Sequence, residues 1–161
     1  PQKIWYAGFM IEYIRRLVLG SNEPTPLEPN AISVGDAAAA ALLVDAASID
    51  GDFDSAERQT IAALLAKKFD LNVEEVGALI NEAAALVDKS VDHYGFARKV
   101  KEAYDHDARV DLMEMLWQVA YADGIVDDFE ANLMRRMAGL LHVSDRESGD
   151  ARKRVIEQLD N

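Results

Sequence analysis

The chain has 161 residues, the usual size of one folded domain. Its 29 Asp and Glu residues outnumber 17 Lys and Arg residues, giving a formal net charge of −12 that disfavours a nucleic-acid partner. The absence of cysteine excludes disulfides, thiolate nucleophiles and Cys-ligated metals, and fits a reducing compartment. We therefore expect a cytoplasmic protein.

Residues 1–20 are expected to form a separate amphipathic helix. Their apolar stretch is interrupted by the charged residues Glu12, Arg15 and Arg16. It is therefore not continuously apolar, as a membrane-spanning helix would be. Its apolar face must be shielded from water. The same domain, a second copy of the chain, another protein or a membrane interface would do this. The predicted partner-binding residues are Ile4, Trp5, Phe9 and Ile14.

Residues 21–35 are expected to form a linker, because three of the four prolines lie there among turn-forming residues. From Asn30 onward the chain has no proline and many Ala, Leu, Glu and Lys residues, which favours helices. Residues 36–161 are thus predicted to be one helical domain. We expect a nearly all-apolar, buried helix at 37–49, then helices at 54–69, from 73 to 87, at 93–104, at 107–122, through 129–141 and at 144–159.

A D-G-x-x-D-x-x-E motif occurs twice, at Asp50–Glu57 and at Asp123–Glu130. Corresponding residues of the two copies are 73 positions apart, as are Leu43 and Leu116 in the helices that precede them. Repetition at a fixed spacing is typical of duplicated structural units. We therefore predict a helical bundle of two pseudo-repeated three-helix units, with each motif at the turn between two helices.

Helix capping explains much of this motif. Its glycines, Gly51 and Gly124, can adopt the left-handed conformation that closes a helix. Asp54 and Asp127 can accept hydrogen bonds from the next helix, and a Glu three residues later completes a capping box. A purely structural interaction domain without metal is therefore one hypothesis for this chain.

The first Asp of each motif is harder to explain by capping. Asp50 and Asp123 are expected at the C-terminal end of a helix, where the helix dipole disfavours negative charge. A hard cation held by carboxylates and loop carbonyls would offset that cost, and oxygen donors favour calcium or magnesium. A metal-dependent hydrolase is a weaker alternative, because no nucleophile, phosphate-loop or zinc-protease motif is present.

Three segments, 49–57, 116–130 and 141–144, resemble the TerB family, a tellurite-resistance-associated domain related to the N-terminal region of the DjlA co-chaperone. The resemblance covers about residues 36–156. It implies an all-helical fold with internal pseudo-symmetry and a metal centre at the acidic turns, in stress-response systems near the membrane. The metal ligands that it implies are Asp50, Asp54, Glu57, Asp123, Asp127 and Glu130.

The function expected from the sequence is therefore that of a non-enzymatic stress-response module. We expect it to bind a divalent cation at the two acidic turns and to engage protein partners, including membrane-associated stress-response components. Formation of a homodimer and a peripheral position at the inner membrane are further expectations.

Overall fold

The computed structural model describes residues 34–48, 53–89 and 95–161. These residues form seven α-helices and no strand, which confirms the predicted all-α class. The predicted N-terminal helix and nearly all of the linker lie outside the described residues. The helices are α2 (Val34–Ser48), α3 (Ser55–Phe69), α4 (Val73–Lys89), α5 (Gly95–Ala103), α6 (His106–Ala120), α7 (Asp128–Leu140) and α8 (Asp145–Asp160).

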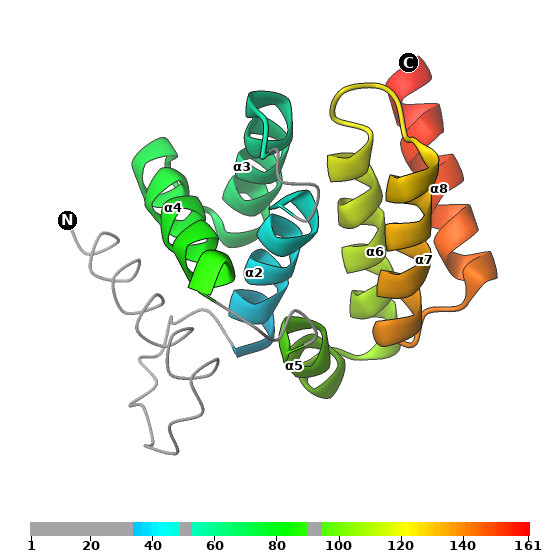
Figure 1. Ribbon diagram of the computed structural model, residues 1–161, viewed down its shortest axis with the longest axis horizontal. Helices are drawn as coiled ribbons and strands as arrows, with labels where there is room; N and C mark the ends of the chain where they lie inside the picture. The colour runs from blue at the N-terminus through cyan, green and yellow to red at the C-terminus, as the bar shows by residue number, and fades with distance from the viewer. Residues whose placement is uncertain (1–33, 49–52, 90–94) are drawn as a thin grey trace.

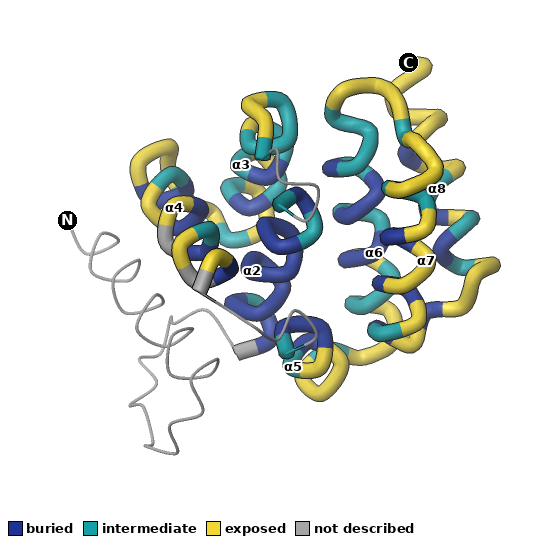
Figure 2. Tube along the Cα trace, in the orientation of Figure 1, coloured by how far each residue is buried: buried dark blue, intermediate teal, exposed yellow. Residues whose placement is uncertain are grey.

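Helix α2 occupies the centre of the bundle. In Figure 1, α3 and α4 lie on one side of it, α6, α7 and α8 lie on the other, and α5 lies near its N-terminal end. Figure 2 shows that α2 is buried along most of its length. Its run of alanines, Ala37–Ala41, has short side chains, and this lets the neighbouring helices approach it closely. The predicted burial of this helix is confirmed.

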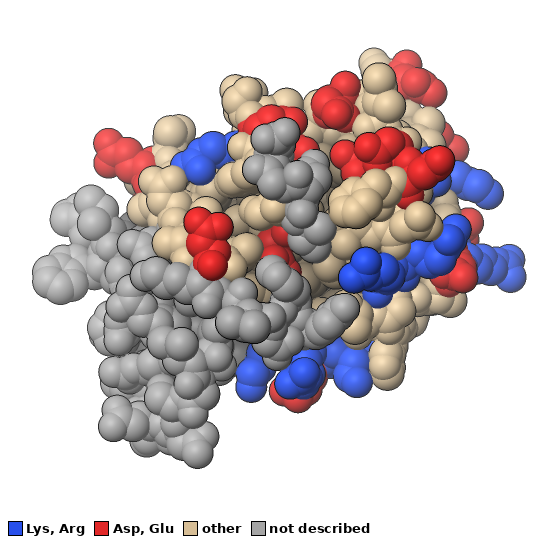
Figure 3. All heavy atoms as spheres, in the orientation of Figure 1, with Lys and Arg blue, Asp and Glu red and all other residues tan. Residues whose placement is uncertain are grey.

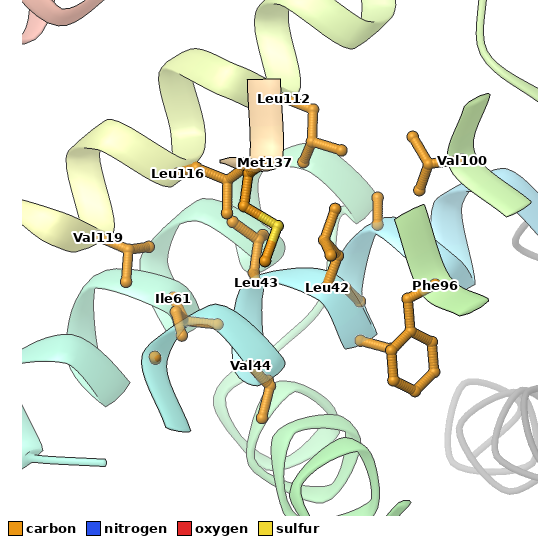
Figure 4. Close-up of a cluster of buried hydrophobic side chains, with 14 of the residues drawn as sticks. Leu42, Leu43, Val44, Ile61, Phe96, Val100, Leu112, Leu116, Val119 and Met137 are labelled. Atoms are coloured by element: carbon orange, nitrogen blue, oxygen red, sulfur yellow. The ribbon is translucent and has the colours of Figure 1, made fainter. Parts of the chain in front are cut away.

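The hydrophobic core joins the two sides of the bundle through α2. Leu42 and Leu43 are fully buried, and Leu116 of α6 is 1% exposed. Burying one such side chain contributes about 1.5–3 kcal/mol. Figure 4 shows the surrounding cluster, in which side chains of α2, α3, α5, α6 and α7 meet: Leu42, Leu43, Val44, Ile61, Phe96, Val100, Leu112, Leu116, Val119 and Met137.

A close approach between α2 and α5 fixes the N-terminal end of the central helix. A Cβ atom added to Gly35 would lie 2.8 Å from the Cβ of Ala103, so only glycine fits there without displacement. The hydroxyl of Tyr104 donates a hydrogen bond to Asp36. Burial, followed by this hydrogen bond, raises the pKa of Tyr104 well above its ordinary value. The tyrosine is therefore neutral and acts as a donor.

Polar side chains begin most of the described helices, and they include the predicted caps Asp54 and Asp127. Each accepts a hydrogen bond from the backbone N–H three residues later, at 2.8–3.1 Å, a contact that contributes about 0.5–2 kcal/mol. The capping residues are Asp54, Asn72, Asp105, Asp127 and Ser144. Among the described helices, none is both long enough and apolar enough to cross a membrane.

Candidate cation site

A small pocket lies where α2, α3, α6 and α7 meet. Its volume is about 30 Å³, enough for a water molecule or a single ion. Most of its wall is apolar, and the acidic residues in the wall are Glu57 and Glu130. The lining residues are Ala46, Ala47, Glu57, Leu116, Val119, Ala120, Phe129, Glu130, Leu133 and Met134.

Glu57 and Glu130 are the corresponding residues of the two sequence motifs, 73 positions apart. Glu57 lies in the first turn of α3 and Glu130 in the first turn of α7. The Oε2 atom of each carboxylate is shielded from solvent, and each residue takes part in a further interaction. The fold thus brings two of the six predicted ligands to one pocket.

Asp54 and Asp127 act as N-caps. The Oδ1 atom of Asp54 accepts the backbone N–H of Glu57 at 2.8 Å, and Asp127 makes the same contact with Glu130 at 2.8 Å. Both aspartates are exposed. Complete capping boxes occur elsewhere, where Asn72 pairs with Glu75 and Ser144 pairs with Glu147.

Asp123 has a different position from the one expected. The sequence predicts a helix that continues to residue 122, but α6 ends at Ala120 and is followed by a turn. Gly124 has φ +88°, as predicted for the motif glycine, and the Oδ1 atom of Asp123 accepts the N–H of Ile125 at 3.1 Å. Because Asp123 lies beyond the last helical residue, the helix dipole destabilises its negative charge less than expected. Its hydrogen bond to Ile125 stabilises the turn.

A family model described as "Tellurite resistance protein TerB" matches residues 36–153. The chain belongs to the TerB family. A search of curated proteins and a search of solved structures found no match. The predicted resemblance is thus confirmed, over nearly the residue range expected from the sequence.

The other predicted site residues of this TerB domain lie outside the described part of the chain. Asp50 is one of them, and the equivalence of Asp50 and Asp123 therefore stays a prediction. The predicted partner-binding residues also lie outside it: Ile4, Trp5, Phe9 and Ile14.

The donor set of the TerB pocket suits a hard cation in chemistry but is incomplete in number. Glu57 and Glu130 offer carboxylate oxygens, the ligands that calcium and magnesium prefer. Within the described ranges, no group of three or more His, Asp or Glu side chains could hold a metal ion. A cation here would need water or residues outside those ranges to complete its coordination.

Sequence reasoning missed Asp45, a carboxylate that is fully buried on α2, directly before the pocket residues Ala46 and Ala47. Asp45 takes part in a further interaction. The available signal was one aspartate within the otherwise apolar run 37–49. Charged residues are rarely fully buried unless they have partners. An aspartate within a predicted core helix therefore indicates a buried polar interaction.

A hydrogen bond and a cation–π contact connect the turn between α6 and α7 to α8. Tyr121 is the C-cap that follows α6, and its hydroxyl accepts a 2.8 Å hydrogen bond from Nε of Arg152. The Arg152 guanidinium also lies 4.8 Å from the ring centroid of Trp117, within cation–π range. These contacts fix the position of Tyr121, which lies directly before the acidic turn.

Negative charge gathers around this turn. The sequence from 110 to 134 contains no Lys, Arg or His, and it includes Asp123, Asp127, Asp128 and Glu130. In Figure 3, acidic side chains cluster over the start of α7, whereas basic side chains lie around α5 and farther along α7 and α8. The TerB domain therefore presents an electronegative surface beside the pocket.

Proposed function

We propose that this TerB domain is a non-enzymatic stress-response module that binds a divalent cation between its two acidic turns and engages protein partners. The observation that carries the proposal is that Glu57 and Glu130 line one small pocket. Two carboxylates in one mostly apolar wall create a negative potential that favours a cation between them. The family's association with tellurite resistance supports the stress-response role.

Matching local geometry supports the duplicated unit that this proposal assumes. Asp70 and His142 follow α3 and α7, and both have a positive φ, 53° and 54°. The next residue in each case bonds to a carbonyl five residues earlier: Leu71 to Ala66 at 3.1 Å, and Val143 to Ala138 at 2.8 Å. The two residues with positive φ are 72 positions apart, close to the 73-residue spacing of the acidic motifs.

We infer that calcium or magnesium is the preferred cation, because the available donors are oxygen atoms. Glu57 and Glu130 would hold it. Water, or Asp50 from outside the described residues, would complete its coordination. The cation would supply positive charge that draws the two acidic turns together. Asp54 and Asp127 would contribute chiefly by fixing the helix starts.

Isothermal titration calorimetry of the full chain with Ca²⁺, Mg²⁺, Mn²⁺ and Zn²⁺ tests the proposal. We expect binding of Ca²⁺ or Mg²⁺ to the unaltered chain. The double substitution Glu57→Gln with Glu130→Gln should abolish the binding heat, because it removes both pocket charges. Asp50→Asn with Asp123→Asn should weaken binding if the turn aspartates also act as ligands.

A matched control separates the pocket from the general acidity of the chain. Glu74 and Glu157 are exposed, so Glu74→Gln with Glu157→Gln removes the same two charges without touching the pocket. This control should keep the binding heat. Absence of binding to the unaltered chain from micromolar to millimolar metal would overturn the cation proposal.

We propose that a protein partner contacts the apolar residues Ile4, Trp5, Phe9 and Ile14. This partner is either a different protein or a second copy of the chain in a homodimer. Analytical ultracentrifugation of the full chain tests the homodimer. Sedimentation as a dimer that reverts to a monomer in Trp5→Ala with Phe9→Ala would support it. A monomer at all accessible concentrations would exclude the homodimer and leave a different protein as the partner.

A purely structural interaction domain is the second candidate, and the capping geometry favours it. Asp54 and Asp127 make the same backbone contact as Asn72 and Ser144, which belong to no acidic motif. This candidate predicts that divalent cations leave the melting temperature unchanged. The cation proposal predicts a rise in melting temperature with metal concentration, because ligand binding to the folded state stabilises it.

A further inference from the structure

The turn between α6 and α7 exposes two large apolar side chains close together in the sequence. Ile125 is 73% exposed and Phe129, in the first turn of α7, is 52% exposed. Three exposed aspartates accompany them: Asp123, Asp127 and Asp128. We name these five residues the α6–α7 turn surface. Its chemistry combines apolar contact area with concentrated negative charge.

A segment that covers this surface should be apolar and positively charged. Residues 1–19 have this composition, because Lys3, Arg15 and Arg16 outnumber the single acidic residue, Glu12. Trp5 and Phe9 supply large apolar side chains. The remainder of the chain carries a strong excess of acidic residues, so the segment and the surface are complementary in both charge and hydrophobicity.

The chain between residue 19 and the start of α2 is long enough for this contact within one chain. The start of α2 touches the end of α5, through Gly35 and Tyr104, only two residues before α6 begins. The turn surface is thus about one length of α6 away, roughly 22 Å for 15 residues. Residues 20–33 can span roughly 50 Å when extended. A tether of this kind also gives the segment a high effective concentration at the surface.

We propose that residues 1–19 dock on the α6–α7 turn surface of the same chain. Trp5 and Phe9 cover Ile125 and Phe129, and the basic residues of the segment face the three aspartates. A protein partner that needs the apolar residues of the segment must displace it from the surface. The docking surface shares Phe129 with the pocket, but the docking itself requires no cation, so it is tested in the absence of metal.

Paramagnetic relaxation in the full chain tests the docking. The chain has no cysteine, so the substitution Ala7→Cys allows a nitroxide to be attached at one known position. In a metal-free buffer, we expect the amide NMR signals of residues 123–129 to lose most of their intensity. They should recover when Arg15→Glu and Arg16→Glu are added, and in part at high salt, because the attraction is electrostatic.

Two substitutions locate the contact. Ile125→Asp and Phe129→Asp, made separately, should each restore the amide signals of the turn surface. Val73, at the start of α4, is 90% exposed, so Val73→Asp is the matched control and should leave the signal loss unchanged. Circular dichroism melting identifies any variant that does not fold, and Ile125→Asp alters a turn residue outside the helices.

Three results would overturn the proposal. The first is the absence of signal loss at residues 123–129, and the second is a signal loss that persists in both Ile125→Asp and Phe129→Asp. The third comes from a mixing experiment that tests whether the contact lies within one chain. Isotopically labelled chain without a nitroxide is mixed with unlabelled chain that carries the nitroxide. Signal loss in that mixture would show that the segment docks on a second copy.

Discussion

The Oδ1 atom of Asp127 accepts the backbone N–H of Glu130 at 2.8 Å, and the side chain of Glu130 lines the pocket that Glu57 also lines. The cap and the candidate ligand are therefore neighbouring groups with separable roles. Asp127 fixes the start of α7, and this start determines where the Glu130 side chain lies.

Substitution of Asp127 should distinguish capping from charge. Asp127→Ala removes the acceptor and should lower the free energy of unfolding by about 0.5–2 kcal/mol. Asp127→Asn keeps an acceptor that is nearly as good and should retain most of the stability. Urea denaturation followed by circular dichroism measures both. Equal losses in the two variants would show that the negative charge, and not the hydrogen bond, is what stabilises α7.

Two glycine substitutions should have opposite effects on stability. Gly35→Ala places a Cβ 2.8 Å from the Cβ of Ala103 and 2.9 Å from the ring of Tyr104, so we expect a loss of about 1–3 kcal/mol. Gly77 lies inside α4, and outside its own stretch of helix no atom lies within 4 Å of an added Cβ. Gly77→Ala should therefore raise stability by about 0.5–1 kcal/mol, since alanine favours a helix interior. Thermal and urea denaturation would measure both changes, and stabilisation by Gly35→Ala would contradict the close approach of α2 and α5.

The buried hydrogen bond from Trp117 to Ser148 should be needed for the contact between α6 and α8. The indole Nε1 lies 3.1 Å from the serine oxygen, and the two residues are 4% and 5% exposed. Ser148→Ala leaves the indole N–H without this acceptor and should cost about 1–3 kcal/mol. The control Ser55→Ala, at an exposed position, should stay within about 0.5 kcal/mol of the unaltered chain. Matching urea midpoints for the two variants would show that the indole finds another acceptor.

Stability should fall in acid partly through Glu147. Hydrogen bonds from His106 first, and then from the amide and hydroxyl of Ser144, lower the pKa of Glu147 from 4.5 to about 2. A lowered carboxyl pKa stabilises the folded state above the unfolded value, and this contribution is lost as pH falls from 4.5 towards 2. The unfolding free energy of Glu147→Gln should therefore change less over this interval than that of the unaltered chain. Acid titration by circular dichroism tests this, with Glu157→Gln as the exposed control; identical acid slopes for Glu147→Gln and the unaltered chain would refute it.

Much of the fold followed from local patterns. The alanine-rich run predicted a buried helix, and α2 lies at the centre of the bundle. Asp54 and Asp127 were predicted to cap helices from their position alone, and both do so. The end of α6 was less predictable, because residues 121 and 122 are compatible with a helix or a turn. Tertiary contacts resolve this choice, since Arg152 holds Tyr121 at the helix end.

The sequence by itself determined the helical class, the caps Asp54 and Asp127, and the family, because these depend on spacing and on the chemistry of neighbouring residues. Only the tertiary structure showed that Glu57 and Glu130 line the same pocket, and that Asp45 is a buried carboxylate. Residues 73 positions apart are brought together by the packing of α3 and α7 around α2 and α6. This packing is a sum of many contacts distant in sequence, which no local pattern records.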